Sequence, residues 1–254
     1  MGRHDPYPRY ADDDRTLVWE PTAALPPRPR RGFRAVAARL AKWALALFLG
    51  LYALFVLLLV VYRFVPPPIT GLQLQRRVEA MFAGREYEPR SDHVALDELP
   101  RHVPRAVVAA EDGRFWDHSG FDLVEMRKAG EAAAEGGRVR GASTLTQQLM
   151  KNLFGCACRN PVRKLYDLTL TPAAELILGK RRILELYLNE VEWGDGVYGI
   201  EAAARHHYGV SARRLTRTQA AGLAALLPNP RRRTPENTGW YRREILRRMR
   251  ARGW

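Results

Sequence analysis

Two adjacent acids, Glu111 and Asp112, are the first residues whose type and position suggest chemistry. They follow a short apolar run at 104–110, which predicts a helix that ends at the acids. A carboxylate at a helix C-terminus faces the negative end of the helix dipole, and apolar neighbours remove water from it. Both effects raise the pKa of the carboxyl group and make it a stronger base. The alternative is an ordinary solvated pair of surface acids.

Phe115 and His118 lie four and seven residues after Glu111. Residues at these spacings share one face of a helix, so both would adjoin the carboxylate if the helix continued. Gly113 falls inside that stretch and disfavours a helix there. The sequence therefore leaves two arrangements open for this segment, one helical and one turning away after the acids.

A second candidate site is the segment GASTLTQQ at 141–148. Thr144 and Gln147 have the spacing of a capping box, which predicts that a helix begins here. The N–H groups at that helix start, together with the hydroxyls of Ser143 and Thr144, would bind an anion, and Lys151 follows two turns later. Spacing alone favours a plainer interpretation, because capping is commoner than phosphate binding. In that case the segment caps a core helix with an apolar stripe at Leu145, Leu149 and Leu153.

A third cluster is basic. Arg159, Arg163 and Lys164 precede Asp167 and Glu175. Cations beside carboxylates can clamp a diphosphate while an acid holds a second group. The same residues can form a solvated helix face with i, i+4 ion pairs such as Arg163–Asp167. Taken singly, none of the three clusters settles the function.

The composition narrows the class of partner. The chain has 254 residues, 46% of them hydrophobic, enough for one catalytic domain with extensions. A net charge of +14 and a pI near 10.3 favour an anionic partner such as nucleic acid, acidic lipid or a phosphorylated substrate, although an Arg-rich proteome would give the same balance. Cys156 and Cys158 lack the spacing of a zinc site, so no metal ligand is assigned.

Residues 43–62 give the clearest physical signal, a run of 20 residues without a charge. A helix of that length spans about 30 Å, the thickness of the hydrocarbon core of a bilayer. Arg63 and the prolines at 66–68 end it, and no small-residue cleavage site follows, so we expect an anchor instead of a signal peptide or a core helix. More Arg and Lys precede the run than follow it, which places the N-terminus in the cytoplasm and residues 63–254 outside. That orientation excludes most nucleic-acid roles.

Composition and periodicity divide the chain into five expected parts. Apolar residues recur at helical spacing beyond about residue 99, whereas the alternation typical of strands is scarce. The last part reads as a basic helix that either lies on lipid or stays solvated. The parts are a disordered cytoplasmic tail (1–32), a transmembrane helix with its flanks (33–65), a membrane-proximal stalk (66–98), a catalytic domain (99–240) and a basic C-terminal helix (241–254).

Taken in order, these clusters closely resemble the peptidoglycan glycosyltransferase family. The resemblance covers about residues 99–230 and includes five motifs in the expected order, which makes it specific. Because the chain ends soon afterwards, we expect the monofunctional biosynthetic type, without a transpeptidase domain. The motifs are EDGRFWDHSGFD (111–122), GASTLTQQLMKN (141–152), RK (163–164), KRRILELYLN (180–189) and WGDGVYGIEAAA (193–204).

The resemblance implies a mostly α-helical, lysozyme-like domain with a membrane-associated jaw, preceded by a single transmembrane helix in the bacterial inner membrane. It implies an inverting enzyme that joins lipid II units into β-1,4-linked glycan strands and releases undecaprenyl diphosphate. The implied partners are lipid II, the nascent strand, membrane lipids and other cell-wall synthesis and division proteins, with no nucleic acid. A divalent cation, most often Mg²⁺, is implied without a protein cage.

The resemblance also assigns roles to individual residues. Glu111 would be the general base that deprotonates the acceptor sugar 4-hydroxyl, and Asp167 would be the second catalytic acid. The substrate and its diphosphate would contact Asp112, Phe115, His118, Ser143, Thr144, Gln148, Lys151, Asn152, Arg159, Arg163 and Lys164.

One departure from the family pattern concerns the second acid. The family has a glutamate at the third place after the Arg-Lys pair, where this chain has Asp167. Its side chain is one methylene shorter, so its reach falls by roughly one C–C bond length. Glu175 lies eight residues further on, and Pro172 is expected to interrupt the helix that would carry both. We therefore expect weaker donor activation and the same reaction class.

Two other functions are compatible with parts of the pattern. A glycan-cleaving enzyme of lysozyme-like fold also uses a glutamate, but it needs neither the lipid anchor nor the cation cluster. A weakened homologue that scaffolds cell-wall assembly is supported by Asp167 and opposed by the intact Glu111. The matched site residues favour synthesis over both.

Overall fold

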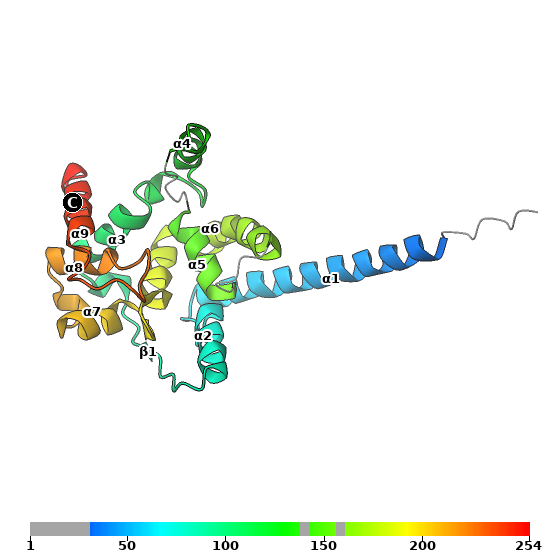
Figure 1. Cartoon of the computed structure of the whole chain (residues 1–254), viewed down its shortest axis with the longest axis horizontal. Helices are drawn as coiled ribbons and strands as arrows, with labels where there is room; N and C mark the ends of the chain where they lie inside the picture. Colours follow the sequence, from blue (N-terminus) through cyan, green and yellow to red (C-terminus); the bar gives the residue numbers. More distant parts are fainter. Residues whose placement is uncertain (1–30, 138–142, 156–160) are drawn as a thin grey trace, which may run out of the picture. The chain divides into compact units, whose positions relative to one another are not determined.

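The computed structural model describes the backbone of residues 31–137, 143–155 and 161–254, and the side chains of 34–137, 143–155 and 168–254. Residues 1–30 of the predicted tail, Arg159, Cys156 and Cys158 lie outside the described residues, and so do the side chains of Arg163, Lys164 and Asp167. The last two residues of that tail, 31 and 32, belong to a helix. Figure 1 shows a mostly helical chain with one small sheet.

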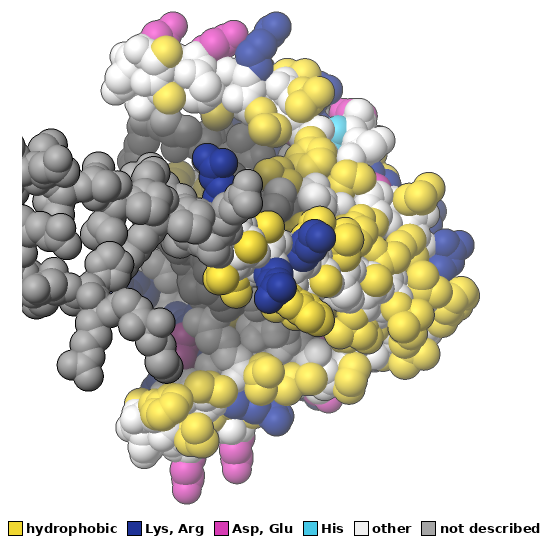
Figure 2. Space-filling model, turned by 90° about the vertical axis from the view of Figure 1, so that its right-hand side faces the viewer, with side chains coloured by type: hydrophobic (Ala, Val, Ile, Leu, Met, Phe, Trp, Pro, Cys, Tyr) yellow, Lys and Arg dark blue, Asp and Glu magenta, His cyan; other side chains and the backbone are white. Residues whose placement is uncertain are grey.

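The predicted membrane span lies in helix α1 (Arg31–Tyr62). Its residues 34–62 have a mean hydropathy of 2.9, which makes the helix long and apolar enough to cross a membrane. Figure 2 shows hydrophobic side chains gathered over one side of the molecule with isolated basic side chains among them. An exposed apolar surface this extensive is unusual on a helix that stays in water. On α1 the exposed apolar side chains include Leu45, Leu47, Leu49, Leu54 and Leu57.

The C-terminal end of α1 is packed into the catalytic domain. Leu59 is fully buried, and the rings of Phe55 and Phe154 are stacked with centroids 4.7 Å apart. The Arg63 guanidinium donates to the carbonyl of Ile177 just after the helix ends. The C-terminal end of α1 is therefore joined to the domain by core contacts as well as by the chain.

Residues 66–98, predicted as a membrane-proximal stalk, pack against the domain. They contain helix α2 (Gly71–Phe82), which begins at Thr70 with a capping box to Gln73. A Cβ on Gly71 would lie 2.5 Å from the Gly155 carbonyl oxygen, so only glycine permits this approach to the end of α5 (Leu145–Phe154). Local sequence patterns do not predict this contact, because Gly155 lies far along the chain from Gly71.

A three-stranded sheet closes one side of the domain. Strand β1 (Arg90–Ser91) pairs in parallel with β3 (Val197–Tyr198), and β2 (Glu192–Gly194) pairs antiparallel with β3. Gly196 has a φ of 71° in the turn between β2 and β3. The strands are short, which agrees with the weak strand signal in the sequence.

Helix α3 (His102–Glu111) ends at the first candidate site, the two acids, and α5 begins in the second, the segment at 141–148. α3 packs against α8 (Arg217–Ala224) and α9 (Gly239–Ala251), whereas α5 packs against α6 (Pro161–Glu190), as Figure 1 shows. The remaining elements are η1 (Leu96–Glu98), η2 (Phe115–Asp117), α4 (Leu123–Ala134), α7 (Ile200–Tyr208) and η3 (Ala212–Arg214).

Helix α6 does not break where the sequence predicted. Pro172 lies within it, and the non-helical residue is Gly179, with φ 72° and ψ 161°. Pro172 removes one backbone donor, but the neighbouring Leu170 and Ala174 are buried in the core and hold the helix together. The expectation of an interruption at Pro172 is therefore wrong, and Glu175 shares one continuous helical stretch with the backbone of residue 167.

The basic C-terminal helix α9 is part of the core. Its Ile245 and Met249 are fully buried, four residues apart on the face that meets α3 and α8. Its arginines lie on the other faces and beside the site described below. A helix solvated on all sides is therefore excluded, and lipid contact by its exposed face stays a prediction.

Candidate active site

A cavity of about 630 Å³ lies where the end of α3, the start of α5 and one side of α9 meet. Four predicted site residues, Glu111, Ser143, Thr144 and Gln148, line it. Asp112 lines it as well, although its side chain is directed into a network of its own. Two motifs separated by about thirty residues in the sequence are thus brought together, as the sequence analysis expected for a single site.

Glu111 is the last residue of α3, with buried alanines behind it and the cavity in front. Its Oε2 accepts a hydrogen bond from Gln148 Nε2 at 3.0 Å. Burial raises the pKa of the Glu111 carboxyl group, and the Gln148 hydrogen bond and nearby Arg233 offset only part of this rise. A carboxylate with a raised pKa in a cavity is suited to accept a proton.

Helix α9 supports the backbone directly behind Glu111. The Tyr241 hydroxyl donates to the Ala110 carbonyl at 2.9 Å, and Arg248 Nη1 donates to the Ala109 carbonyl at 3.2 Å. The last carbonyls of a helix have no partner within it, so they need donors from elsewhere. α9 supplies those donors and fixes the end of α3 that carries the acid.

Asp112 connects the two motifs. Its Oδ2 accepts from the Leu145 N–H at 3.0 Å, at the start of α5, and its Oδ1 lies 3.0 Å from His118 Nε2. The Gly120 N–H donates to His118 Nδ1, so in the neutral ring Nε2 carries the proton and donates to Asp112. Asp112 and His118 therefore position the end of α3 against the start of α5, and their predicted contact with substrate stays a prediction.

The start of α5 has the predicted capping box, formed by Thr144 and Gln147. The Thr144 hydroxyl also donates to the Gly120 carbonyl at 2.6 Å. The N–H groups of Thr144, Leu145 and Gln147 all have protein acceptors. These three N–H groups are therefore engaged within the protein, and exposed Ser143 faces the cavity. An anion contact at the start of α5 stays a prediction.

A cluster of three possible metal ligands lies beside the cavity. Among the described residues, ligand atoms of Asp112, His118 and Asp122 lie within 4.8 Å of one another. Asp122 caps α4 through the N–H groups of residues 124 and 125, and it pairs with Arg114 at 3.3 Å. Mg²⁺ prefers an octahedron of oxygen ligands that includes several waters. This satisfied cluster of one imidazole and two engaged carboxylates does not fit it.

Other predicted contacts lie behind the cavity wall. The Phe115 side chain is fully buried, with the Lys180 ammonium 4.3 Å from its ring centroid, and Asn152 is also buried. α3 ends at Glu111, so Phe115 and His118 do not share its helical face. Lys151 is exposed and lowers the pKa of Glu111 by its charge. The side chains of Arg163, Lys164 and Asp167, and all of Arg159, lie outside the described part of the chain.

Glu175 is engaged elsewhere. Its Oε1 accepts from Thr146 Oγ1 at 2.6 Å and from Lys180 Nζ at 2.9 Å. The carboxylate therefore ties α5 to α6 across the core. This agrees with the expectation that Glu175 does not replace Asp167 without a shift.

The cavity residues from the C-terminal region were not among the predicted site residues. Tyr241 and Arg248 are seven residues apart, which places them on one helix face, and this spacing beside the buried Ile245 was a signal that they point inward. The C-terminal region forms one wall of the cavity with Arg233, Trp240, Tyr241, Arg248 and Arg252.

Comparison with known proteins agrees with this site. Residues 77–251 match the model of the transglycosylase family, which includes α3, α5 and α9. The chain belongs to the transglycosylase family. The family match also covers much of the segment predicted as a stalk and most of the basic C-terminal helix.

Several curated relatives of the transglycosylase family are similar over most of the chain. A biosynthetic peptidoglycan transglycosylase of Pseudomonas fluorescens (strain SBW25) is 49% identical over 176 residues, covering 69% of this chain and 73% of the relative. That of Stutzerimonas stutzeri (strain A1501) is 48% identical over 185 residues, covering 73% and 76%. That of Caulobacter vibrioides is 43% identical over 197 residues, covering 78% and 83%. The chain is thus a peptidoglycan transglycosylase with the lysozyme-like fold of its family.

Proposed function

We propose that this transglycosylase polymerises lipid II into β-1,4-linked glycan strands and releases undecaprenyl diphosphate. The observation that carries the proposal is Glu111, a carboxylate with a raised pKa held by Gln148 at the wall of a cavity. A cavity of about 630 Å³ is of the size that holds a substrate of several rings.

In the proposed reaction, the ionised Glu111 accepts the proton of the acceptor sugar 4-hydroxyl. The oxygen then forms a bond to the donor anomeric carbon, and the bond from that carbon to the diphosphate breaks on the opposite face, so the configuration inverts. A positioned general base contributes about 10²–10⁴-fold to the rate. The proton leaves Glu111 to solvent before the next addition.

The leaving diphosphate needs cations, because negative charge develops on it as the bond breaks. Lys151 is exposed on α5, and we assign Arg159, Arg163, Lys164 and the second acid Asp167 to the same task from their motif positions. The divalent cation expected from the resemblance stays a prediction. Since the cluster of Asp112, His118 and Asp122 does not fit it, no step is assigned to a metal there.

The proposed location follows from α1. A helix that crosses the bacterial inner membrane with its N-terminus in the cytoplasm would place the cavity outside, beside a substrate that carries its own lipid. Lipid II and the nascent strand are then the substrates, and membrane lipids surround α1. Other cell-wall synthesis and division proteins stay predicted partners.

The experiment is polymerisation of labelled lipid II by the full chain in vesicles. We compare the parent with Glu111→Gln, Asp167→Glu and the control Glu131→Gln, an exposed acid on α4. Polymer from the parent and from the control, lost in Glu111→Gln, supports the proposal. A faster Asp167→Glu would show that the short acid limits the rate. Polymer from Asp167→Glu alone would overturn the proposal in favour of a scaffold.

A further inference from the structure

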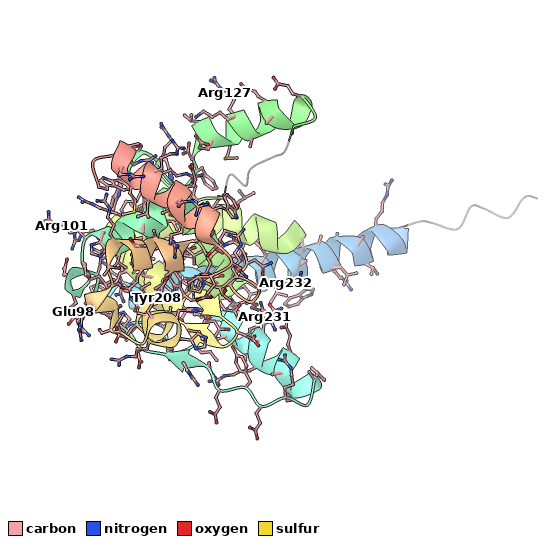
Figure 3. All side chains as sticks on the ribbon, turned by 60° about the vertical axis from the view of Figure 1, so that its left-hand side comes forward. Glu98, Arg101, Arg127, Tyr208, Arg231 and Arg232 are labelled. Carbon is pink, nitrogen blue, oxygen red and sulfur yellow. The ribbon has the colours of Figure 1, made fainter. Side chains whose placement is uncertain are left out.

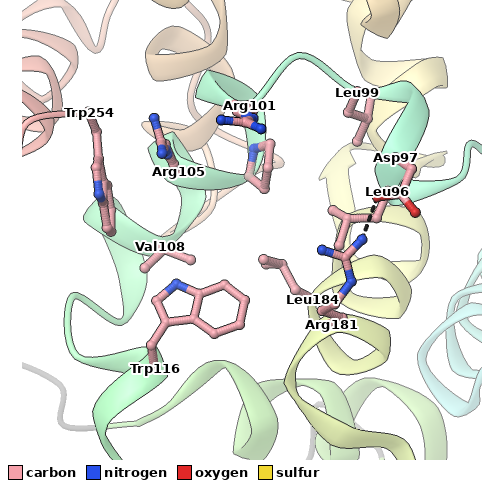
Figure 4. Close-up of a pocket in the computed structure, with 11 residues that line it drawn as sticks. Leu96, Asp97, Leu99, Arg101, Arg105, Val108, Trp116, Arg181, Leu184 and Trp254 are labelled. Carbon is pink, nitrogen blue, oxygen red and sulfur yellow. Dashed lines mark hydrogen bonds and ion pairs between the residues drawn. The ribbon is translucent and has the colours of Figure 1, made fainter.

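A second cavity of about 580 Å³ lies beside α3 and outside the active site. Figure 4 shows two tryptophans on one side of it and arginines around its rim. Val108 of α3 and Leu184 of α6 are buried and form an apolar floor. Trp116 stands beside that floor with half of its side chain surface exposed, at 50%. An exposed indole in a concave site offers a flat apolar surface to a ring.

The rim of this cavity is positively charged. Three guanidinium groups, those of Arg101, Arg105 and Arg181, line it, against one carboxylate, that of Asp97. Asp97 is paired with Arg181, which leaves the other two arginines in excess. Figure 3 shows Arg101 at the edge of the molecule, and the Arg105 guanidinium lies 5.8 Å from the ring of Trp254. Guanidinium groups bind carboxylates through paired hydrogen bonds, so the rim favours a carboxylate ligand.

The two cavities adjoin through one stack of side chains. Arg252 lines the active-site cavity, and its guanidinium lies 5.6 Å from the ring of Trp254, which lines the second cavity. Helix α3 contributes Val108 to the second cavity and Glu111 to the active site, three residues apart. The two cavities therefore lie close together, separated by the Arg252–Trp254 pair.

We propose that this second cavity is an outer subsite for a glycan segment whose peptide substituents carry carboxylates. The C–H face of one sugar ring packs on the Trp116 indole, and a carboxylate accepts hydrogen bonds from Arg105 and Arg101. The proposal rests on the proposed function, because the ligand is the strand that the active site extends. The subsite would hold part of that strand while the next unit is added.

An anionic lipid surface is the competing ligand for the same charges. It would bind a protruding apolar and basic surface, since lipid head groups lie in a plane. The indole here lies in a recess with a buried apolar floor, which fits a single ring better than a plane. The closeness of the active-site cavity, across the Arg252–Trp254 pair, also favours the glycan.

The test uses the full chain in detergent with Glu111→Gln as the parent, so that no turnover occurs. The probe is a purified peptidoglycan tetrasaccharide that carries its peptides, and binding is measured by calorimetry. Loss of a charge-assisted hydrogen bond weakens binding by roughly tenfold or more, so we expect that effect for Arg105→Gln. Trp116→Ala should weaken binding similarly, whereas Trp116→Phe should keep most of it.

Two controls separate this subsite from general charge effects. Arg127→Gln removes the same charge from an exposed position on α4, which Figure 3 labels, and should bind like the parent. Chitotetraose, an uncharged glycan of the same length, should bind more weakly and show no response to Arg105→Gln. Thermal unfolding of each variant shows whether it is folded. If Trp116→Ala is unfolded, the conclusion is drawn from Arg105→Gln.

Unchanged binding in both Arg105→Gln and Trp116→Ala would overturn the subsite. So would a loss seen only with phosphatidylglycerol vesicles, which would assign the cations to lipid. Lipid II polymerisation by the chain with intact Glu111 is measured in parallel. If polymer forms but Arg105→Gln and Trp116→Ala bind the fragment like the parent, only the subsite is rejected. If no polymer forms, the proposed function is rejected whatever the binding result.

Discussion

Gln148 Nε2 donates a hydrogen bond to Glu111 Oε2 at 3.0 Å, while Gln148 Oε1 accepts one from the Tyr187 hydroxyl at 2.9 Å. The buried tyrosine thus fixes which end of the amide faces the acid. Because the amide can only donate through nitrogen, the arrangement favours the ionised carboxylate. It counteracts part of the rise in the Glu111 pKa that burial causes.

Gln148→Leu removes that hydrogen bond and should raise the Glu111 pKa further. A general base works when ionised, so activity falls as the pH drops through its pKa. The acid limb of the profile of kcat/KM against pH should therefore move to higher pH in the variant, with a smaller loss of rate at alkaline pH. An acid limb at the same pH in both proteins would show that Glu111 does not set it.

Arg248→Gln should loosen the end of α3. The side chain donates to the carbonyls of Ala109 and Ala110, at 3.2 and 3.4 Å, and its charge lowers the Glu111 pKa. We expect a loss of about 1–2 kcal/mol in the free energy of unfolding, together with a lower kcat. Arg250→Gln, an exposed arginine on the same helix, is the matched control and should change neither. Equal effects of the two would contradict a specific role for Arg248.

Asp112→Ala should destabilise the protein more than loss of an exposed acid. It leaves the Leu145 N–H and His118 Nε2 without their acceptor in the interior, which costs about 1–3 kcal/mol. Thermal unfolding compares it with Asp117→Ala, an exposed position in the same loop. If Asp112→Ala keeps the parent's stability and changes only substrate affinity, Asp112 is a substrate contact after all.

Glu190→Gln should stabilise the protein at alkaline pH. Burial raises the Glu190 pKa from 4.5 to about 7, so the folded state resists ionisation. The wild-type side chain is neutral in the folded protein below its raised pKa, and stability is lost as the pH rises towards 7. This rise in the Glu190 pKa corresponds to a loss of roughly 3 kcal/mol in the free energy of unfolding above pH 7. The melting temperature of Glu190→Gln should exceed the parent's at pH 8 and approach it at pH 5; a constant difference would contradict this.

The sequence determined the elements that local signals specify. Apolar periodicity predicted α3 and its end at Glu111, and the Thr144–Gln147 pair predicted the start of α5. Such signals act over one or two turns of helix, so they can be recognised without knowledge of the fold. The motif order also pointed to the family that the comparisons show.

Only the tertiary structure decided which side chains face the cavity. Asp112 contacts the backbone of Leu145, and Tyr241 contacts that of Ala110, over separations of 33 and 131 residues. Spacing along the chain carries no information about such pairs, because they depend on how helices pack. For the same reason Phe115, predicted to touch substrate, is in the core, and the basic helix α9, predicted to lie on lipid or stay solvated, forms a wall of the site.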